Sequence, residues 1–146
     1  MNGIEGRGAL NEPALVKRVD LPPAKEADEQ EAYFAWIRTR LGKWPELVLA
    51  HAVPNGGSRH KVEAARLKAQ GVRAGIPDIF IPVPRGIYHG AYIELKRTKG
   101  GRLSKAQKEI IPRLREQGYF VAVCEGWFDA AGATLAYMML AAGQKL

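Results

Sequence analysis

Three short apolar runs constrain the fold of this chain more than any other feature of its sequence. They span residues 76–83, 91–97 and 119–125, and each is bounded by residues that favour turns. Runs of this length that are rich in branched or aromatic residues are typical of β-strands rather than helices. Only residues 84–90 separate the first two runs, so we expect these two strands to pair as a hairpin.

Helices are predicted around these strands. Helical spacing predicts one over 26–41, with an inward stripe of Ala27, Gln30, Phe34, Ile37 and Leu41. Further helices are expected over 61–70, 105–117 and 128–142. Ser104 is the expected N-cap of the helix over 105–117, and Pro112 should kink that helix or divide it into two pieces.

Residues 46–53 are predicted as one more short strand. The resulting order of helices and strands favours an α/β fold, with a central mixed β-sheet flanked by helices. Residues 1–25 are rich in Gly, Pro and scattered charge, and we expect them to form a flexible leader. The remaining residues, 26–146, are enough for a single domain with its own hydrophobic core.

The charge of the chain favours a polyanionic partner. Lys and Arg number 22 against 15 acidic residues, which gives a formal net charge of +7. Each phosphate that a basic side chain neutralises releases counterions, so such an excess favours nucleic acid, although many small basic proteins bind nothing specific.

No segment approaches the roughly 18 apolar residues of a membrane span. We expect no membrane partner, and a cytoplasmic protein of a bacterial or phage-infected cell. The single cysteine, Cys124, is expected to be a buried strand thiol.

The chemistry is predicted to lie on the hairpin. Side chains alternate along a strand, so Tyr92, Glu94 and Lys96 share one face, and Asp78 begins the preceding strand. Two carboxylates supply the oxygen ligands that Mg²⁺ or Mn²⁺ prefers, and a lysine can orient water or stabilise charge at a phosphate. A Glu and a Lys two residues apart on a strand are commonly only solvated. Here, however, Glu94 interrupts an otherwise apolar strand and needs a partner or a metal.

Several motifs in this order resemble those of a known superfamily. Gly75-Ile76-Pro77-Asp78 is followed by Ile93-Glu94-Leu95-Lys96, and then by Gly101-Arg102-Leu103-Ser104 with Gln107. This pattern resembles the PD-(D/E)XK nuclease superfamily, whose core is restriction-endonuclease-like. More narrowly, it resembles the virus-type replication-repair nuclease (VRR-NUC) domain, and the resemblance runs from about residue 26 to residue 127.

The resemblance implies roles for individual residues. Asp78 and Glu94 would be metal ligands, the Leu95 carbonyl a further ligand, and Lys96 the catalytic lysine. Gln107 matches a glutamine that lies near the site in the family. The family also uses an acid from its first helix, for which Glu29 and Glu31 both qualify.

Two basic groups bracket the predicted site and are expected to contact DNA phosphates. One follows the lysine strand and comprises Lys99, Arg102 and Lys105; the other precedes it and comprises Arg59, Lys61, Arg66, Lys68 and Arg73. Neither group contains aromatic residues at a spacing that would suggest stacking on single-stranded DNA. His51 is expected to make a local hydrogen bond at the end of a strand, with substrate contact as the alternative.

We therefore expect a Mg²⁺- or Mn²⁺-dependent DNA endonuclease that hydrolyses phosphodiester bonds. The resemblance implies branched substrates, such as Holliday junctions or flaps, in replication, recombination or repair in a phage or prophage. It also suggests a homodimer, for which the apolar helix at residues 134–142 could form the interface if it is not core. The alternatives are a non-catalytic basic DNA-binding module and a sequence-specific restriction-type endonuclease.

Overall fold

A four-stranded mixed sheet forms the centre of the protein, as predicted. The computed structural model describes residues 25–54 and 60–146. The strands are β1 (His51–Ala52), β2 (Ile79–Ile81), β3 (Ala91–Lys96) and β4 (Phe120–Glu125), and they lie side by side in that order. β1 and β2 pair antiparallel, β2 and β3 form the expected antiparallel hairpin, and β3 and β4 are parallel.

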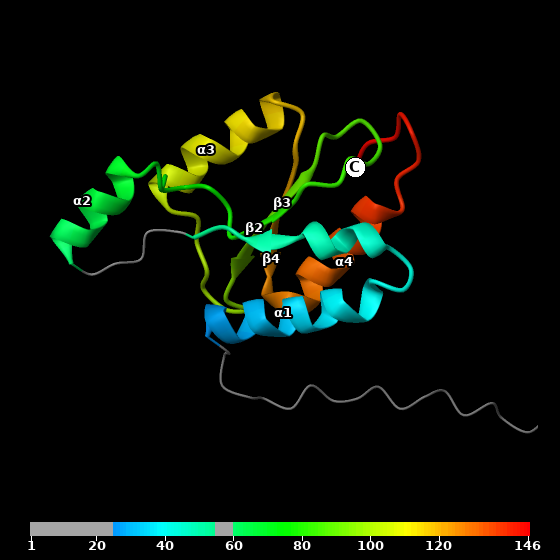
Figure 1. The fold of residues 1–146 in the computed structure, drawn as a ribbon, viewed down its shortest axis with the longest axis horizontal. Helices are drawn as coiled ribbons and strands as arrows, with labels where there is room; N and C mark the ends of the chain where they lie inside the picture. Colours follow the sequence, from blue (N-terminus) through cyan, green and yellow to red (C-terminus); the bar gives the residue numbers. More distant parts are fainter. Residues whose placement is uncertain (1–24, 55–59) are drawn as a thin grey trace, which may run out of the picture.

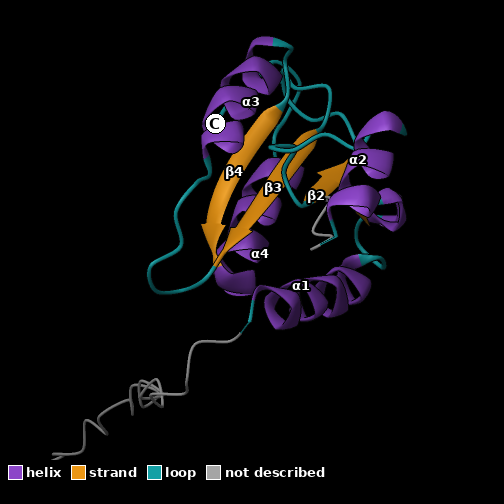
Figure 2. Ribbon diagram, turned by 90° about the vertical axis from the view of Figure 1, so that its left-hand side faces the viewer, coloured by secondary structure: helices purple, strands orange, loops and turns teal. Residues whose placement is uncertain are grey.

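Helices cover both faces of this sheet. Parallel strands need a crossover connection, and α3 (Lys105–Glu116) supplies it between β3 and β4 on one face. α1 (Glu26–Arg40) and α4 (Gly126–Met138) lie together on the other face (Figures 1 and 2). α2 (Lys61–Ala69) projects from one end of the molecule, and none of its residues is buried (Figure 1).

The buried face of α1 differs from the predicted stripe. Its buried residues are Glu29, Tyr33 and Ile37. Of the predicted stripe, Ile37 is therefore confirmed and Phe34 and Leu41 are partly buried against the core, whereas Ala27 is exposed. Both polar groups are satisfied by α4. The Tyr33 hydroxyl bonds the Thr134 hydroxyl at 2.8 Å, and Glu29 Oε2 accepts the Trp127 N–H at 2.7 Å. Polar side chains that find partners in this way can be buried, which a count of apolar residues does not detect.

Residues 46–53 are not the continuous strand that we predicted. They form a 3₁₀ helix, η1 (Pro45–Leu49), followed by the two-residue strand β1. Pro45 explains the difference, because a proline at the first helical position has its φ angle already set for a helix. The Glu46 side chain also pairs with Arg85, which holds η1 against the loop between β2 and β3.

α3 begins as predicted but is not divided by Pro112. Ser104 is its N-cap and accepts the Gln107 N–H at 3.2 Å. The helix continues through Pro112 to Glu116 as one element. Pro112 is exposed, so the carbonyl that loses its helical partner can be hydrated.

Cys124 is buried in β4, as expected, with 2% of its surface exposed. Among residues 25–54 and 60–146, no helix has the length and apolar character to span a bilayer. The predicted leader falls almost entirely within residues 1–24, outside the described part of the chain.

The buried thiol leads to a testable prediction. Burial raises the pKa of Cys124 from 9.0 to about 12, and only the thiolate is reactive. We therefore expect iodoacetamide at pH 8 to leave the native protein unmodified and to alkylate it once in denaturant, as measured by mass spectrometry. Because the folded state holds this proton more tightly than the unfolded state, the free energy of unfolding should fall as the pH rises from 9 toward 12. Equal alkylation of the native and denatured protein would contradict this account.

A second prediction concerns Glu29, which caps the first turn of α4 from a distant part of the chain. Glu29→Ala should lower the free energy of unfolding by about 1 kcal/mol, which is typical for the loss of a helix cap. Glu31→Ala is the matched control, since Glu31 is exposed on the same helix, and it should change stability by less than about 0.5 kcal/mol. Urea unfolding followed by circular dichroism measures both. If the two variants were equally stable, the cap would contribute nothing.

Candidate active site

The β2–β3 hairpin brings the two predicted acids together. In its register Ile79 lies opposite Ile93, so Asp78 and Glu94 form the next pair beyond the first residue of β2. Asp78 is fixed there through both its backbone and its side chain. Its carbonyl accepts the Val53 N–H at 2.7 Å, and its Oδ2 accepts the Leu95 N–H at 2.9 Å.

Glu94 is a carboxylate enclosed by protein. Its exposed fraction is 1%, and its Oε1 accepts bonds from Lys96 Nζ at 2.7 Å and from Gln107 Nε2 at 2.6 Å. Its Oε2 is buried and has no hydrogen-bond partner in the described part of the chain. Burial raises the pKa of Glu94, as does the nearby charge of Asp78, while the bonds from Lys96 and Gln107 lower it. Oε1 of the carboxylate is therefore stabilised by two donors, whereas Oε2 has no positive partner in the described part of the chain.

Gln107 links the helix cap to the acid. It is the third residue of α3, and its Oε1 accepts the Ser104 N–H at 2.8 Å, which completes a capping box. The same Oε1 lies 3.2 Å from Lys96 Nζ, while Nε2 faces Glu94. The backbone N–H of Ser104 therefore sets which way the amide points. The resemblance placed Gln107 near the site, and the structure places it there.

Lys96 lies on the same face of β3 as Glu94, as the strand period predicts. Its side chain is 11% exposed and donates to Glu94 and Gln107. An ammonium has three N–H donors, so one is left over to face a phosphate or a water molecule.

The donor set at this site suits a hard divalent cation. Glu94 Oε2 has no hydrogen-bond partner among the described residues, and the neighbouring Asp78 supplies further carboxylate oxygen. The N–H and C=O of one strand residue point to the same side. Since the Leu95 N–H points to Asp78, the Leu95 carbonyl also lies on that side, past the end of β2.

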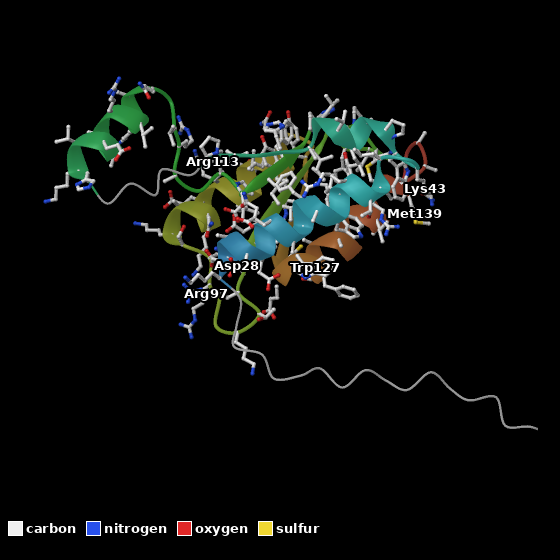
Figure 3. The ribbon with its side chains drawn as sticks, turned by 60° about the horizontal axis from the view of Figure 1, so that its bottom comes forward. Asp28, Lys43, Arg97, Arg113, Trp127 and Met139 are labelled. Carbon is white, nitrogen blue, oxygen red and sulfur yellow. The ribbon has the colours of Figure 1, made fainter. Side chains whose placement is uncertain are left out.

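The first-helix acids lie apart from this pair. Within the described ranges, no three His, Cys, Asp or Glu side chains gather into a group that could hold a metal. Glu29 is buried and bonded to Trp127, whereas Glu31 is exposed on α1. In Figure 3, Arg97, which follows the last residue of β3, and Asp28 on α1 lie at the same end of the molecule.

The predicted DNA-binding side chains are exposed. Lys99 and Arg102 lie in the loop after β3 and Lys105 begins α3, while Lys61, Arg66, Lys68 and Arg73 lie on or just after α2. Arg59 lies outside the described residues. The His51 ring bonds the Leu49 carbonyl at 2.9 Å, which is the local hydrogen bond that we expected.

Two glycines allow neighbouring segments to approach closely around this site, and their structural role was not deduced from the sequence. A Cβ at Gly101 would lie 2.8 Å from the Lys96 Cβ, so only glycine lets the basic loop pass this close to the lysine. Gly75 has φ +89°, and a Cβ there would lie 2.5 Å from the Ala106 carbonyl oxygen of α3. The signal for both roles was their position in the loops flanking the two strands.

A family model and a solved structure match this chain. The family model of the VRR-NUC domain matches residues 24–127. A solved structure described as a VRR_NUC domain protein superimposes with a TM-score of 0.74 and is 31% identical, covering 86% of this chain and 99% of that one. Among curated proteins the search found no match. The family match spans more than two thirds of the sequence and includes Asp78, Glu94, Lys96 and Gln107. The chain therefore belongs to the VRR-NUC family of nuclease domains.

Proposed function

We propose that this nuclease is a metal-dependent DNA endonuclease. Its active site, formed by Asp78, Glu94 and Lys96, hydrolyses phosphodiester bonds of the DNA. The observation that carries the proposal is the buried Oε2 of Glu94, which lies beside a second carboxylate and has no hydrogen-bond partner within residues 25–54 and 60–146. An orphan charged oxygen in a protein interior is costly, so a site that retains one calls for a cationic ligand. Mg²⁺ or Mn²⁺ is the proposed ion, because both prefer oxygen donors.

Each side chain then has a distinct task. A metal held by Asp78, Glu94 and the Leu95 carbonyl would polarise the phosphoryl oxygen and acidify a water molecule. Lys96 directs its remaining N–H toward the scissile phosphate or the attacking water, where it stabilises developing negative charge. Gln107 holds Lys96 and Glu94 in position through its two amide ends. The first-helix acids Glu29 and Glu31 are left out of this ligand set, because among the described residues neither gathers with Asp78 and Glu94 into a group that could hold a metal.

The substrate is proposed to be branched DNA, such as a Holliday junction or a flap, in replication or repair in a phage-infected or bacterial cytoplasm. The exposed basic residues after β3 and on α2 support contact with phosphates on both sides of the acids.

A homodimer would present two such sites to one junction. Part of the predicted interface, residues 134–142, is core, because Thr134, Tyr137 and Met138 are buried. Phe128 and Met139, each 69% exposed on or beside α4, support the dimer, and a monomer at micromolar concentration would contradict it.

Cleavage assays test the catalytic proposal. Labelled four-way junction, flap, duplex and single-stranded DNA are incubated with Mg²⁺, Mn²⁺ or chelator. We expect metal-dependent cutting that falls by about 10²-fold or more in Asp78→Ala and Lys96→Ala, because both remove groups that act on the transition state. Lys43→Ala is the matched control. It removes an exposed lysine that lies over Trp44, just past the end of α1 (Figure 3), and should cut normally.

The rival function gives a different result in the same assay. A non-catalytic DNA-binding module would bind DNA equally well in all four proteins and in chelator, and would cut none of the substrates. That result would overturn the proposed endonuclease. Cutting of one duplex sequence in preference to branched DNA would instead favour a restriction-type enzyme.

A further inference from the structure

Five aromatic rings form a continuous row across the sheet. His51, Phe80, Tyr92, Tyr119 and His89 come from β1, β2, β3 and the loops before β3 and β4. Phe80 stacks on Tyr92 with ring centroids 4.5 Å apart. Edge-to-face contacts join His51 to Phe80 at 5.7 Å, Tyr92 to Tyr119 at 5.4 Å, and Tyr119 to His89 at 6.1 Å.

The row lies on the catalytic face of the sheet. Phe80 is opposite Tyr92 and His51 is opposite Phe80, so these three side chains share a face. Tyr92 and Glu94 are two residues apart on β3 and therefore also share that face, about 7 Å apart along the strand. The ring row and the two acids are thus adjacent parts of one surface.

These rings do not belong to the main hydrophobic core. That core contains Tyr33 and Tyr137 and lies between the opposite face of the sheet and the helices α1 and α4. In the row, His51 and His89 are exposed, and Phe80, Tyr92 and Tyr119 are half-buried. Partly exposed apolar rings that lie together beside a nuclease site indicate a binding surface, on which a ligand with an apolar face can stack.

We propose that this row is a stacking platform for unpaired DNA bases next to the scissile phosphate, an inference that rests on the proposed function. Every nucleobase has an apolar π-face, and aromatic side chains bind such faces with little dependence on sequence. The bases of a continuous duplex are stacked on one another, so only unpaired or splayed bases can reach the rings. The basic side chains near the acids would hold the phosphates of the same strand.

The platform specifies the substrate class more closely than the acids do. The acids act on the phosphodiester that all DNA shares, whereas the rings favour DNA with unpaired bases at the cleavage point. Flaps, gaps and the open centres of junctions meet this condition, and a fully paired duplex does not.

Binding to matched oligonucleotides tests the platform. Fluorescence anisotropy in chelator compares a single strand of thymidines with an abasic strand of the same length, which keeps the phosphates and lacks the bases. We expect the thymidine strand to bind about tenfold more tightly, within the range for a stacked base. Tyr92→Leu and Tyr119→Leu should remove most of this difference and leave abasic binding unchanged. Phe34→Leu, which alters a half-buried ring of α1 on the other face of the sheet, is the control and should retain the difference.

Photocrosslinking tests the same proposal without a substitution that could disturb folding. Strands that carry 5-iodouracil are irradiated with the unaltered protein, and the crosslinked peptides are identified by mass spectrometry. Crosslinks at Phe80, Tyr92 or Tyr119 support the platform. Crosslinks confined to other residues, or equal binding of the thymidine and abasic strands, overturn it.

The two proposals can fail separately. If branched DNA is cut in Mg²⁺ or Mn²⁺ but bases add nothing to binding, the platform is wrong and the endonuclease stands. If bases add to binding through Tyr92 but no DNA is cut, the platform stands and the endonuclease is wrong.

Discussion

The carboxylate of Glu94 is almost wholly buried, and the arrangement of the site depends on how its charge is balanced. Burying a carboxylate costs several kcal/mol unless partners replace the lost water. Lys96 and Gln107 replace it at Oε1, but no side chain in the described structure does so at Oε2. The capping box at the start of α3 orients the amide of Gln107 toward Glu94, and α3 itself forms the crossover from β3 to β4. The fold thus places Glu94 beside Asp78 with donors on only one of its two carboxylate oxygens. This arrangement favours the binding of a cation.

Much of this could be predicted from the sequence, because the relevant signals are local. The two-residue period of β3 puts Glu94 and Lys96 on one face, and the short turn before it makes the hairpin that brings Asp78 opposite Glu94. Ser104 with Gln107 three residues later is a capping signature that can be recognised in the sequence. The resemblance to the VRR-NUC domain then added a role for Gln107 that spacing alone does not provide.

The features that escaped prediction depend on contacts between distant segments. Glu29 is buried because Trp127, 98 residues later, supplies an N–H for it. The segment at Pro45–Leu49 is helical although its composition is strand-like, since Pro45 and the pairing of Glu46 with Arg85 favour the 3₁₀ turn. The aromatic row is invisible in the sequence because its rings come from separate strands and loops. Only the register of the sheet aligns Phe80 with Tyr92 and His51, so no spacing within one segment could have shown it.

The central claim is that Asp78 and Oε2 of Glu94 bind a divalent cation, and anomalous scattering from crystals grown with Mn²⁺ tests it most directly. The account predicts a single strong anomalous peak between these two carboxylates and near the Leu95 carbonyl. It also predicts that crystals of Glu94→Gln under the same conditions lose the peak. A peak elsewhere on the protein, or no peak between Asp78 and Glu94 at saturating Mn²⁺, would contradict the account.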